Sequence, residues 1–184
     1  MDLDKAIKDR HCVRKFNSKK PSWKKIIACM DATRYAPMAG NGFTLKLILV
    51  DDSKKINKIA KACQQPFINT AKYVVVACSN PSLPTNAYEK QGEIYVRQQA
   101  GAALQNFLLK IEESGLDTCW VGFFAEDQIK RELKIPAKIQ IEAVFPIGYE
   151  AIKARKRLKT ELDAFLYFNK YGNKKKKKIK KLDV

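Results

Sequence analysis

Residues 73–78 constrain the fold of this chain more than any other segment. They read Tyr-Val-Val-Val-Ala-Cys, with three valines in succession and no charged residue. β-Branched and aromatic side chains favour extended backbone, and an uninterrupted apolar run is typical of a strand buried inside a sheet. We therefore predict a buried strand here, with the hydrophobic core gathered around it.

Helical and extended patterns lie on both sides of this run. Apolar spacing predicts helices over residues 2–9, 23–33, 54–63, 93–114 and 126–133. Extended patterns predict strands over residues 45–50, 118–123 and 139–147. Ser22 can cap the second helix, Gly115 can end the longest one, and residues 80–84 indicate a loop. The chain thus combines helices with strands, and it contains no internal repeat.

The length of 184 residues, 46% of them hydrophobic, suffices for one domain with a proper core. We assign this domain to residues 1–171 and predict that residues 172–184 form a disordered, lysine-rich tail. An apolar group precedes the tail and consists of Leu162, Phe165, Leu166, Tyr167 and Phe168. No strand pattern remains nearby for this group to join, so we expect it to pack on a partner subunit or on a neighbouring face.

The chain is strongly basic, with a formal net charge of +17 from 36 basic and 19 acidic residues. Residues 170–184 hold eight lysines and one aspartate, so the rest of the chain is basic too. Such a surface attracts nucleic acids, anionic membranes and phosphorylated small molecules alike. The tail lacks the interleaved aromatic residues that stack on bases. A nucleic-acid-binding protein is therefore the weaker alternative.

The cysteines and the single histidine, His11, limit the possible metal sites. Five cysteines, at positions 12, 29, 63, 78 and 119, form no Cys-x-x-Cys pair. This set does not fit a Cys/His site, so no metal is expected. The odd number of cysteines and the lack of an apolar leader predict reduced thiols and a cytoplasmic location. No run reaches the ~18 apolar residues of a membrane span, so no membrane contact is expected.

Two short motifs carry candidate chemistry. The first, residues 10–16, reads Arg-His-Cys-Val-Arg-Lys-Phe, and the guanidinium groups of Arg10 and Arg14 could flank a phosphate. The second, residues 36–42, reads Ala-Pro-Met-Ala-Gly-Asn-Gly and leads into the strand predicted at 45–50. Together they indicate a phosphate clamp and a close-fitting backbone loop, which a phosphorylated planar cofactor needs. Surface charges and an ordinary helix–strand loop are the alternatives.

At these residues the chain resembles the FMN-dependent nitroreductase family. The first motif is similar to the family's Arg-Arg-Ser-x-Arg-x-Phe opening, and the second to its Ala-Pro-Ser-x-x-Asn-x loop. Residues 102–109 resemble the family's central helix, and residues 118–123 resemble its cofactor-edge strand. Further matches are Leu-Lys-Ile-Pro at 133–136, Ile-Gly-Tyr at 147–149 and Arg-Lys-Arg-Leu at 155–158. The pattern covers residues 3–160.

The resemblance implies an α+β protein with a three-layer α/β/α nitroreductase-like fold around a mixed, largely antiparallel central sheet. It also implies a homodimer with two FMN sites at the interface and C-terminal segments that embrace the partner. The implied FMN-binding residues are Arg10, His11, Cys12, Arg14, Pro37, Met38, Ala39, Asn41, Val121, Gly122, Arg155 and Arg157. The four arginines would hold the phosphate, residues 37–41 would lie beside the flavin ring, and a backbone N–H at Val121 or Gly122 would face flavin N5.

The activity implied by the resemblance is hydride transfer from NADH or NADPH, through flavin N5, to a small electrophilic acceptor such as a nitroaromatic or a quinone. The flavin carries this chemistry, so we assign no catalytic side chain. A specialised relative that performs reductive dehalogenation or cofactor modification on the same fold is an alternative. The chain departs from the family at Cys12, where serine is usual, at Met38 and Phe43, and at Gln99, where an acid is frequent.

Overall fold

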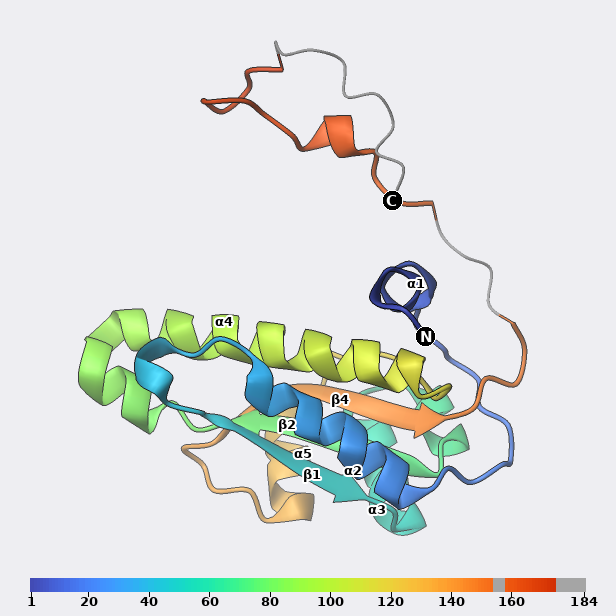
Figure 1. Ribbon diagram of the computed structural model, residues 1–184. Coiled ribbons are helices and arrows are strands. Elements are labelled where there is room, and N and C mark those ends of the chain that lie inside the picture. The colour runs from blue at the N-terminus through green and yellow to red at the C-terminus, as the bar shows by residue number, and fades with distance from the viewer. Residues whose placement is uncertain (154–157, 175–184) are drawn as a thin grey trace. The chain divides into compact units, whose positions relative to one another are not determined.

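The computed structural model describes residues 1–153 and 158–174 of the chain (Figure 1). The described residues divide into two compact units after Lys153. The first unit holds every strand and every α-helix of the described residues, so it is an α+β unit. It also holds all the predicted site residues except Arg155 and Arg157, which lie outside the described residues.

The sheet is built around β2 (Tyr73–Ser79), every residue of which is buried. β2 lies between β1 (Leu45–Val50) and β4 (Gln140–Gly148), and β3 (Asp117–Thr118) pairs with the far edge of β4. Within the described residues, all of these pairings are antiparallel. The buried strand predicted at residues 73–78 is thus confirmed, and it occupies an interior position in the sheet.

Helices cover both faces of this sheet (Figure 1). On one face lie α2 (Trp23–Asp31) and α4 (Ser82–Glu113), and α1 (Leu3–Asp9) packs against α4. On the other face lie α3 (Ser53–Ala62) and α5 (Glu126–Leu133). The three-layer α/β/α arrangement is therefore confirmed.

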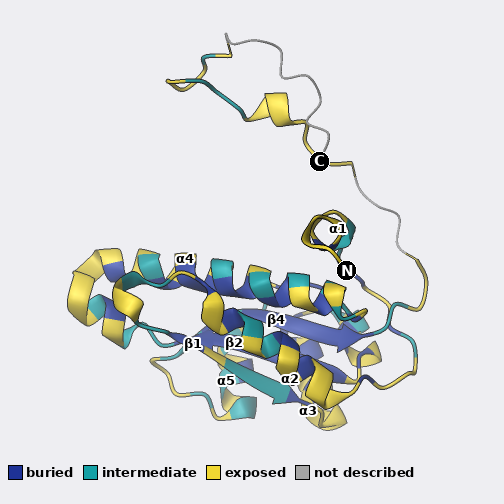
Figure 2. Ribbon diagram, in the orientation of Figure 1, coloured by how far each residue is buried: buried dark blue, intermediate teal, exposed yellow. Residues whose placement is uncertain are grey.

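Side chains that alternate along β2 sort the core into two clusters, one on each face of the sheet. Val75 packs in the cluster that contains Phe107 of α4, whereas Val76 packs in the cluster of Ile59 and Ile129 from α3 and α5. Figure 2 shows β2 and β4 as buried, the edge strand β1 as largely intermediate and the outward helix surfaces as exposed. Full burial of one such side chain stabilises the fold by about 1.5–3 kcal/mol. The two clusters hold the helical layers on the sheet.

The longest helix begins earlier than the sequence pattern predicts. α4 starts at Ser82 rather than at residue 93, so the prediction of a loop through residues 80–84 is wrong in its second part. Pro84 does not prevent this start, because proline is tolerated in the first turn of a helix. The chain then turns at Glu89, with φ of 50° and ψ of −132°. A Cβ on Gly92 would lie 2.2 Å from the Pro84 carbonyl oxygen, so only glycine allows this close return.

Two other boundaries differ from the predictions. The helix predicted at 23–33 ends at Asp31 and continues as a 3-10 helix, η1 (Ala32–Tyr35). The strand predicted at 118–123 is shorter, because after β3 the chain rejoins the sheet through a single bridge from Val121 to Val144. The other predicted helices and strands are confirmed to within one or two residues.

The segment that follows α1 is fastened to the edge of the sheet. The Val13 N–H donates to the Thr118 carbonyl oxygen at 2.9 Å, and Phe16 forms an antiparallel bridge with Glu150. Val13 and Phe16 are both buried. Backbone hydrogen bonds and packing therefore fix the segment that carries the first predicted motif.

The second unit contains one short 3-10 helix, η4 (Leu162–Ala164), among its described residues. The Tyr167 and Tyr171 rings lie 4.8 Å apart, and the Phe168 N–H donates to the Asn173 carbonyl oxygen at 2.8 Å. Packing of this apolar group on a partner stays a prediction. So does the disordered tail predicted at residues 172–184, of which residues 175–184 lie outside the described residues. Among the described residues, no helix combines the length and the apolar character that a membrane span requires.

Gly148 should not tolerate a side chain. An added Cβ would lie 2.7 Å from Cδ1 of Phe16, so alanine would push the N-terminal segment away from β4. We expect Gly148→Ala to lower the free energy of unfolding by about 1–3 kcal/mol, measured by urea denaturation.

The matched control is Gly101→Ala, because an added Cβ on this helical glycine meets nothing within 4 Å. This variant should be neutral or more stable by up to about 1 kcal/mol. Equal losses of stability in the two variants would contradict the role of Gly148.

Candidate functional site

The first predicted motif leaves the end of α1 and runs along the edge of the sheet. Arg10 follows the last residue of α1, and its N–H donates to the Ala6 carbonyl oxygen at 3.1 Å. Val13 is buried, whereas Arg14 is exposed. The charges of Arg10 and Arg14 both act on Cys12, which lies between them in the sequence. The fixed backbone thus presents two guanidinium groups to the surroundings of one thiol.

The Cys12 thiol lies where negative charge is stabilised. A hydrogen bond with the Cys119 thiol has the largest effect and lowers the pKa of Cys12, while burial opposes it. A backbone hydrogen bond at Trp120 and the charges of Arg14 and Arg10 also lower this pKa, which falls to about 5. The same contact, together with burial, raises the pKa of the Cys119 thiol. This position therefore favours an anion.

Cys12 should be the most reactive cysteine of the protein. At pH 7 a thiol with a pKa of about 5 is ionised, whereas burial raises the pKa of Cys63 to about 12 and that of Cys78 to about 11. Because the thiolate is the nucleophile, we expect iodoacetamide to modify Cys12 first in the ligand-free protein. The rate should be constant above neutral pH and should fall as the pH drops through about 5.

The site of modification is read by peptide mass spectrometry, with Cys12→Ser as the control. A Cys12 rate that still rises steeply between about pH 7 and 9, as for an ordinary thiol, would contradict the assignment.

The second predicted motif forms an exposed loop with two residues in left-handed backbone geometry. Gly40 has φ of 56° and Asn41 has φ of 55°, both in the 3-10 helix η2 (Ala39–Asn41). Pro37 and Asn41 are exposed, while Met38 is half-buried. A Cβ on Gly40 would lie 3.0 Å from the Tyr88 hydroxyl oxygen, so the tyrosine leaves little room for a side chain here.

Gln99 of α4 holds the end of this loop. Its Oε1 accepts hydrogen bonds from the Thr44 N–H at 2.7 Å and from the Thr44 hydroxyl at 2.6 Å. Its Nε2 donates to the Gly42 carbonyl oxygen at 2.9 Å. Thr44 and Gln99 are both buried. The amide satisfies donors and an acceptor at once, which an ionised acid cannot do.

Gln99→Glu should therefore destabilise the protein. A carboxylate keeps the bonds from Thr44 but leaves the Gly42 carbonyl without its donor, at a cost of about 1–3 kcal/mol in a buried place. The measurement is urea denaturation at pH 7. Gln105→Glu, an exposed position on the same helix, is the matched control and should change stability by less than about 0.5 kcal/mol. Equal stabilities of the two variants would contradict the proposed contact.

The Val121–Gly122 pair, which the resemblance places at flavin N5, is called the third motif here. The Val121 N–H donates to the Val144 carbonyl oxygen at 3.0 Å, so it is already used by the sheet. The amide of exposed Gly122 is therefore the member of the pair that can face a ligand. Trp120, just before them, packs edge-on against Phe145 with ring centroids 5.3 Å apart, which anchors this backbone on the core.

The structure brings the first and third motifs together and leaves the second motif apart. Cys12 interacts with Cys119, close to the third motif. His11 lies within range of the charge of Glu112, whereas the second motif is held by Gln99. The stretch of α4 from Gln99 to Glu112 spans about 20 Å at the usual rise of an α-helix. In Figure 1 the loop and the N-terminal segment accordingly lie toward opposite ends of α4.

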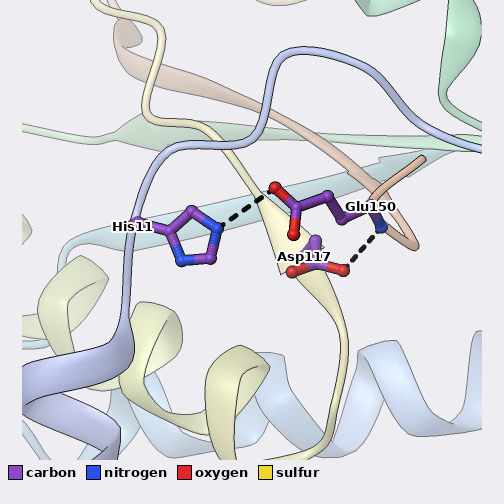
Figure 3. Close-up of side chains that lie close together, drawn as sticks. All are labelled: His11, Asp117 and Glu150. Atoms are coloured by element: carbon purple, nitrogen blue, oxygen red, sulfur yellow. Dashed lines mark hydrogen bonds and ion pairs between the residues drawn. The ribbon is translucent and has the colours of Figure 1, made fainter. Parts of the chain in front are cut away.

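His11 belongs to a side-chain cluster that the sequence motifs did not indicate (Figure 3). Its Nδ1 lies 2.8 Å from the Asp9 carbonyl oxygen, and its Nε2 lies 3.3 Å from Oε1 of Glu150. Burial lowers the pKa of His11, but the hydrogen bonds with Asp9 and Glu150 outweigh it and the pKa is raised. Asp117 accepts a hydrogen bond from the Glu150 N–H at 2.7 Å. The sequence gives one indication of this cluster. Asp117 precedes the strand predicted at 118–123 and Glu150 follows the strand predicted at 139–147, and these two ends lie side by side when the strands pair antiparallel.

A three-layer α+β fold with a basic segment at the sheet edge is what the resemblance to the nitroreductase family implies, and comparison with known proteins agrees. The model of the nitroreductase family matches residues 7–68 and 56–149. The chain therefore belongs to the nitroreductase family.

Individual relatives cover most of the chain. A protein of Archaeoglobus fulgidus, provisionally named NADH dehydrogenase/NAD(P)H nitroreductase, is 27% identical over 79% of this chain and 83% of its own. Iodotyrosine deiodinase of Thermotoga neapolitana is 23% identical over 77% of this chain and 85% of its own. The solved structure of an FMN-dependent nitroreductase of Clostridium difficile has a TM-score of 0.77, with 22% identity over 90% of this chain and 98% of that one. This likeness shows the shared fold.

Proposed function

We propose that this protein is an FMN-dependent oxidoreductase that passes a hydride from NADH or NADPH to a small electrophilic acceptor, such as a nitroaromatic or a quinone. The observation that carries the proposal is the segment around Cys12, which backbone pairing of Val13 and Phe16 holds on the sheet edge and which brings the charges of Arg10 and Arg14 to one thiol. FMN, when bound, supplies a ring that accepts a hydride and delivers electrons to an acceptor. The residues of the chain then need only bind FMN and orient it toward the donor and the acceptor.

Arg10 and Arg14 suit a phosphate dianion better than a neutral group. Guanidinium–phosphate hydrogen bonds are charge-assisted and contribute about 1.5–3 kcal/mol each. Because buried Val13 is hydrogen-bonded to Thr118, the backbone between the arginines loses little entropy on binding. A phosphate here would repel a Cys12 thiolate, so FMN should raise the pKa of Cys12. The resemblance also assigns Arg155 and Arg157 to the phosphate, but both lie outside the described residues.

Gly122 suits the edge of a planar ring. It is exposed and follows Val121, whose own N–H is bonded within the sheet. A Cβ on Gly122 would meet Trp120 at 3.7 Å, an ordinary contact, so the fold itself does not require glycine here. Close approach of a ring to this backbone does require it. We assign the N–H that faces flavin N5 to Gly122.

The second motif would reach the flavin from another protomer. Within one chain the second motif is held by Gln99, whereas His11 lies near Glu112, far along α4. The resemblance to the family nevertheless places the second motif beside the flavin ring. We infer a homodimer in which residues 37–41 of one protomer complete the site formed by Arg10 and Arg14 of the other. Exposed apolar side chains on the α1–α2 side support such an interface: Leu3, Ile7, Trp23, Ile27 and Tyr35.

The five free cysteines support a cytoplasmic location.

Flavin binding is the decisive test. The purified protein should show flavin bands in its visible spectrum, and heating should release FMN. Arg10→Ala combined with Arg14→Ala should weaken FMN binding about 100-fold or more, because two charge-assisted contacts are lost. The matched control is Lys61→Ala combined with Arg131→Ala, which removes the same charge from exposed positions on α3 and α5.

Affinity is measured by quenching of flavin fluorescence in titrations of the deflavinated protein. Equal FMN affinity of the two double variants would overturn the phosphate assignment. A protein that neither carries nor takes up FMN would overturn the proposed function, and salt-sensitive nucleic-acid binding would then be the alternative to measure.

Reductive dehalogenation is a second candidate, because a deiodinase is among the relatives of comparable coverage. The discriminating measurement supplies the FMN-loaded protein with reductant and either a nitroaromatic or an iodinated aromatic. Oxidation of NADH or NADPH coupled to nitro reduction supports the first candidate. Release of iodide without nitro reduction supports the second.

A further inference from the structure

We propose that His11, Asp117 and Glu150 form a binding site for a divalent transition-metal ion, of which Zn²⁺ is the natural probe. One imidazole nitrogen and two carboxylates make a mixed ligand set that such ions accept. The three ligand atoms all lie within 4.8 Å of one another (Figure 3). The sequence predicts no metal site made of cysteine and histidine, because it contains a single histidine. That prediction did not consider a site with carboxylate ligands.

Three backbone segments hold these ligands at one edge of the sheet. Asp117 lies in β3 opposite Gly148 of β4, and Glu150 lies two residues beyond Gly148. Phe16 bridges Glu150, which brings the N-terminal segment with His11 alongside. The Glu150 N–H donates to Oδ2 of Asp117 at 2.7 Å and ties two of the ligands together. Ligands on paired strands are held more rigidly than ligands on free loops.

The orientation of the His11 ring is the observation that favours a cation. Nδ1 lies 2.8 Å from the Asp9 carbonyl oxygen, which can only accept, so Nδ1 must carry a proton. In neutral imidazole, Nε2 then points a lone pair toward Oε1 of Glu150, and two acceptors facing each other repel. A proton or a metal ion between them removes the repulsion. Metal-binding histidines commonly donate their other N–H to a backbone carbonyl in this way.

The separation of the ligand atoms suits a metal better than a direct hydrogen bond. Nε2 of His11 and Oε1 of Glu150 lie 3.3 Å apart. An imidazolium–carboxylate hydrogen bond is usually about 2.7–2.9 Å long. Two ligands at about 2.0–2.2 Å from a tetrahedral Zn²⁺ lie about 3.3–3.6 Å apart. The observed spacing therefore leaves room for an ion with little movement of these two side chains.

The cluster places two carboxylates beside one imidazole and is partly shielded from solvent. The side chains of His11 and Glu150 are only 28% and 17% exposed, so solvent screens them weakly.

The experiment uses the full chain with its FMN content unchanged, in a Cys12→Ser background. This background removes the reactive thiol, which could itself bind Zn²⁺. After dialysis against a chelator, Zn²⁺ is titrated by calorimetry, and thermal unfolding is followed with and without Zn²⁺. We expect one ion per chain and a higher midpoint of unfolding with Zn²⁺.

Asp117→Asn and Glu150→Gln are the informative variants, since the amide oxygen that replaces the Asp117 carboxylate can still accept from the Glu150 N–H and preserve the fold. Each should weaken Zn²⁺ binding about 10-fold or more. The matched control is Glu113→Gln, an exposed acid on α4, which should bind Zn²⁺ as the parent does. No bound Zn²⁺ in the parent, or equal affinity in all variants, would overturn the proposal and leave His11 and Glu150 as an ion pair. Neither outcome depends on FMN binding.

Discussion

The backbone hydrogen bonds that fasten the N-terminal segment to the sheet edge are the constraint on which the site depends. The bond from Val13 to Thr118 and the bridge between Phe16 and Glu150 fix the path of the chain after α1. Without them, Arg10 and Arg14 would be surface charges on a free segment, and Cys12 would not meet Cys119. Gly148 permits this pairing, because only a residue without a Cβ leaves space for Phe16. The edge of the sheet thus serves both the fold and the site.

A second constraint acts on the loop of the second motif. The Gln99 amide bonds to both Thr44 and Gly42, so α4 determines where the loop emerges. Gln99 stands where the family frequently has an acid, and its amide fits the backbone groups of Thr44 and Gly42 that it contacts. The same helix separates this loop from the N-terminal segment of its own chain. This separation along α4 supports the proposed homodimer, in which two protomers share the site.

Much of the fold could be predicted from the sequence, and the reasons are local. The valine run of β2 and the apolar faces of α3 and α5 identify their elements by pattern alone. The early start of α4 could not be predicted, because Pro84 and Glu89 interrupt the helical pattern while Gly92 lets the chain fold back. β3 is shorter than predicted because, among residues 119–123, only Val121 rejoins the sheet, through its bridge to Val144.

The site was predictable only in part. The motif at residues 10–14 pointed to an anion, and the structure supplies surroundings that stabilise one at Cys12. The partners of this motif could not be predicted. Cys119 contacts Cys12 and Glu150 contacts His11, but both partners are distant in sequence and reach the motif only when the strands pair. The register of β3 against β4 decides those meetings, and register is a property of the whole sheet.

A crystal structure of the protein with FMN tests the central claim most directly. We predict that the phosphate lies between the guanidinium groups of Arg10 and Arg14, with the ring edge against Gly122 and residues 37–41 of the partner subunit. A phosphate bound elsewhere, or a ring enclosed by one protomer alone, would contradict this arrangement.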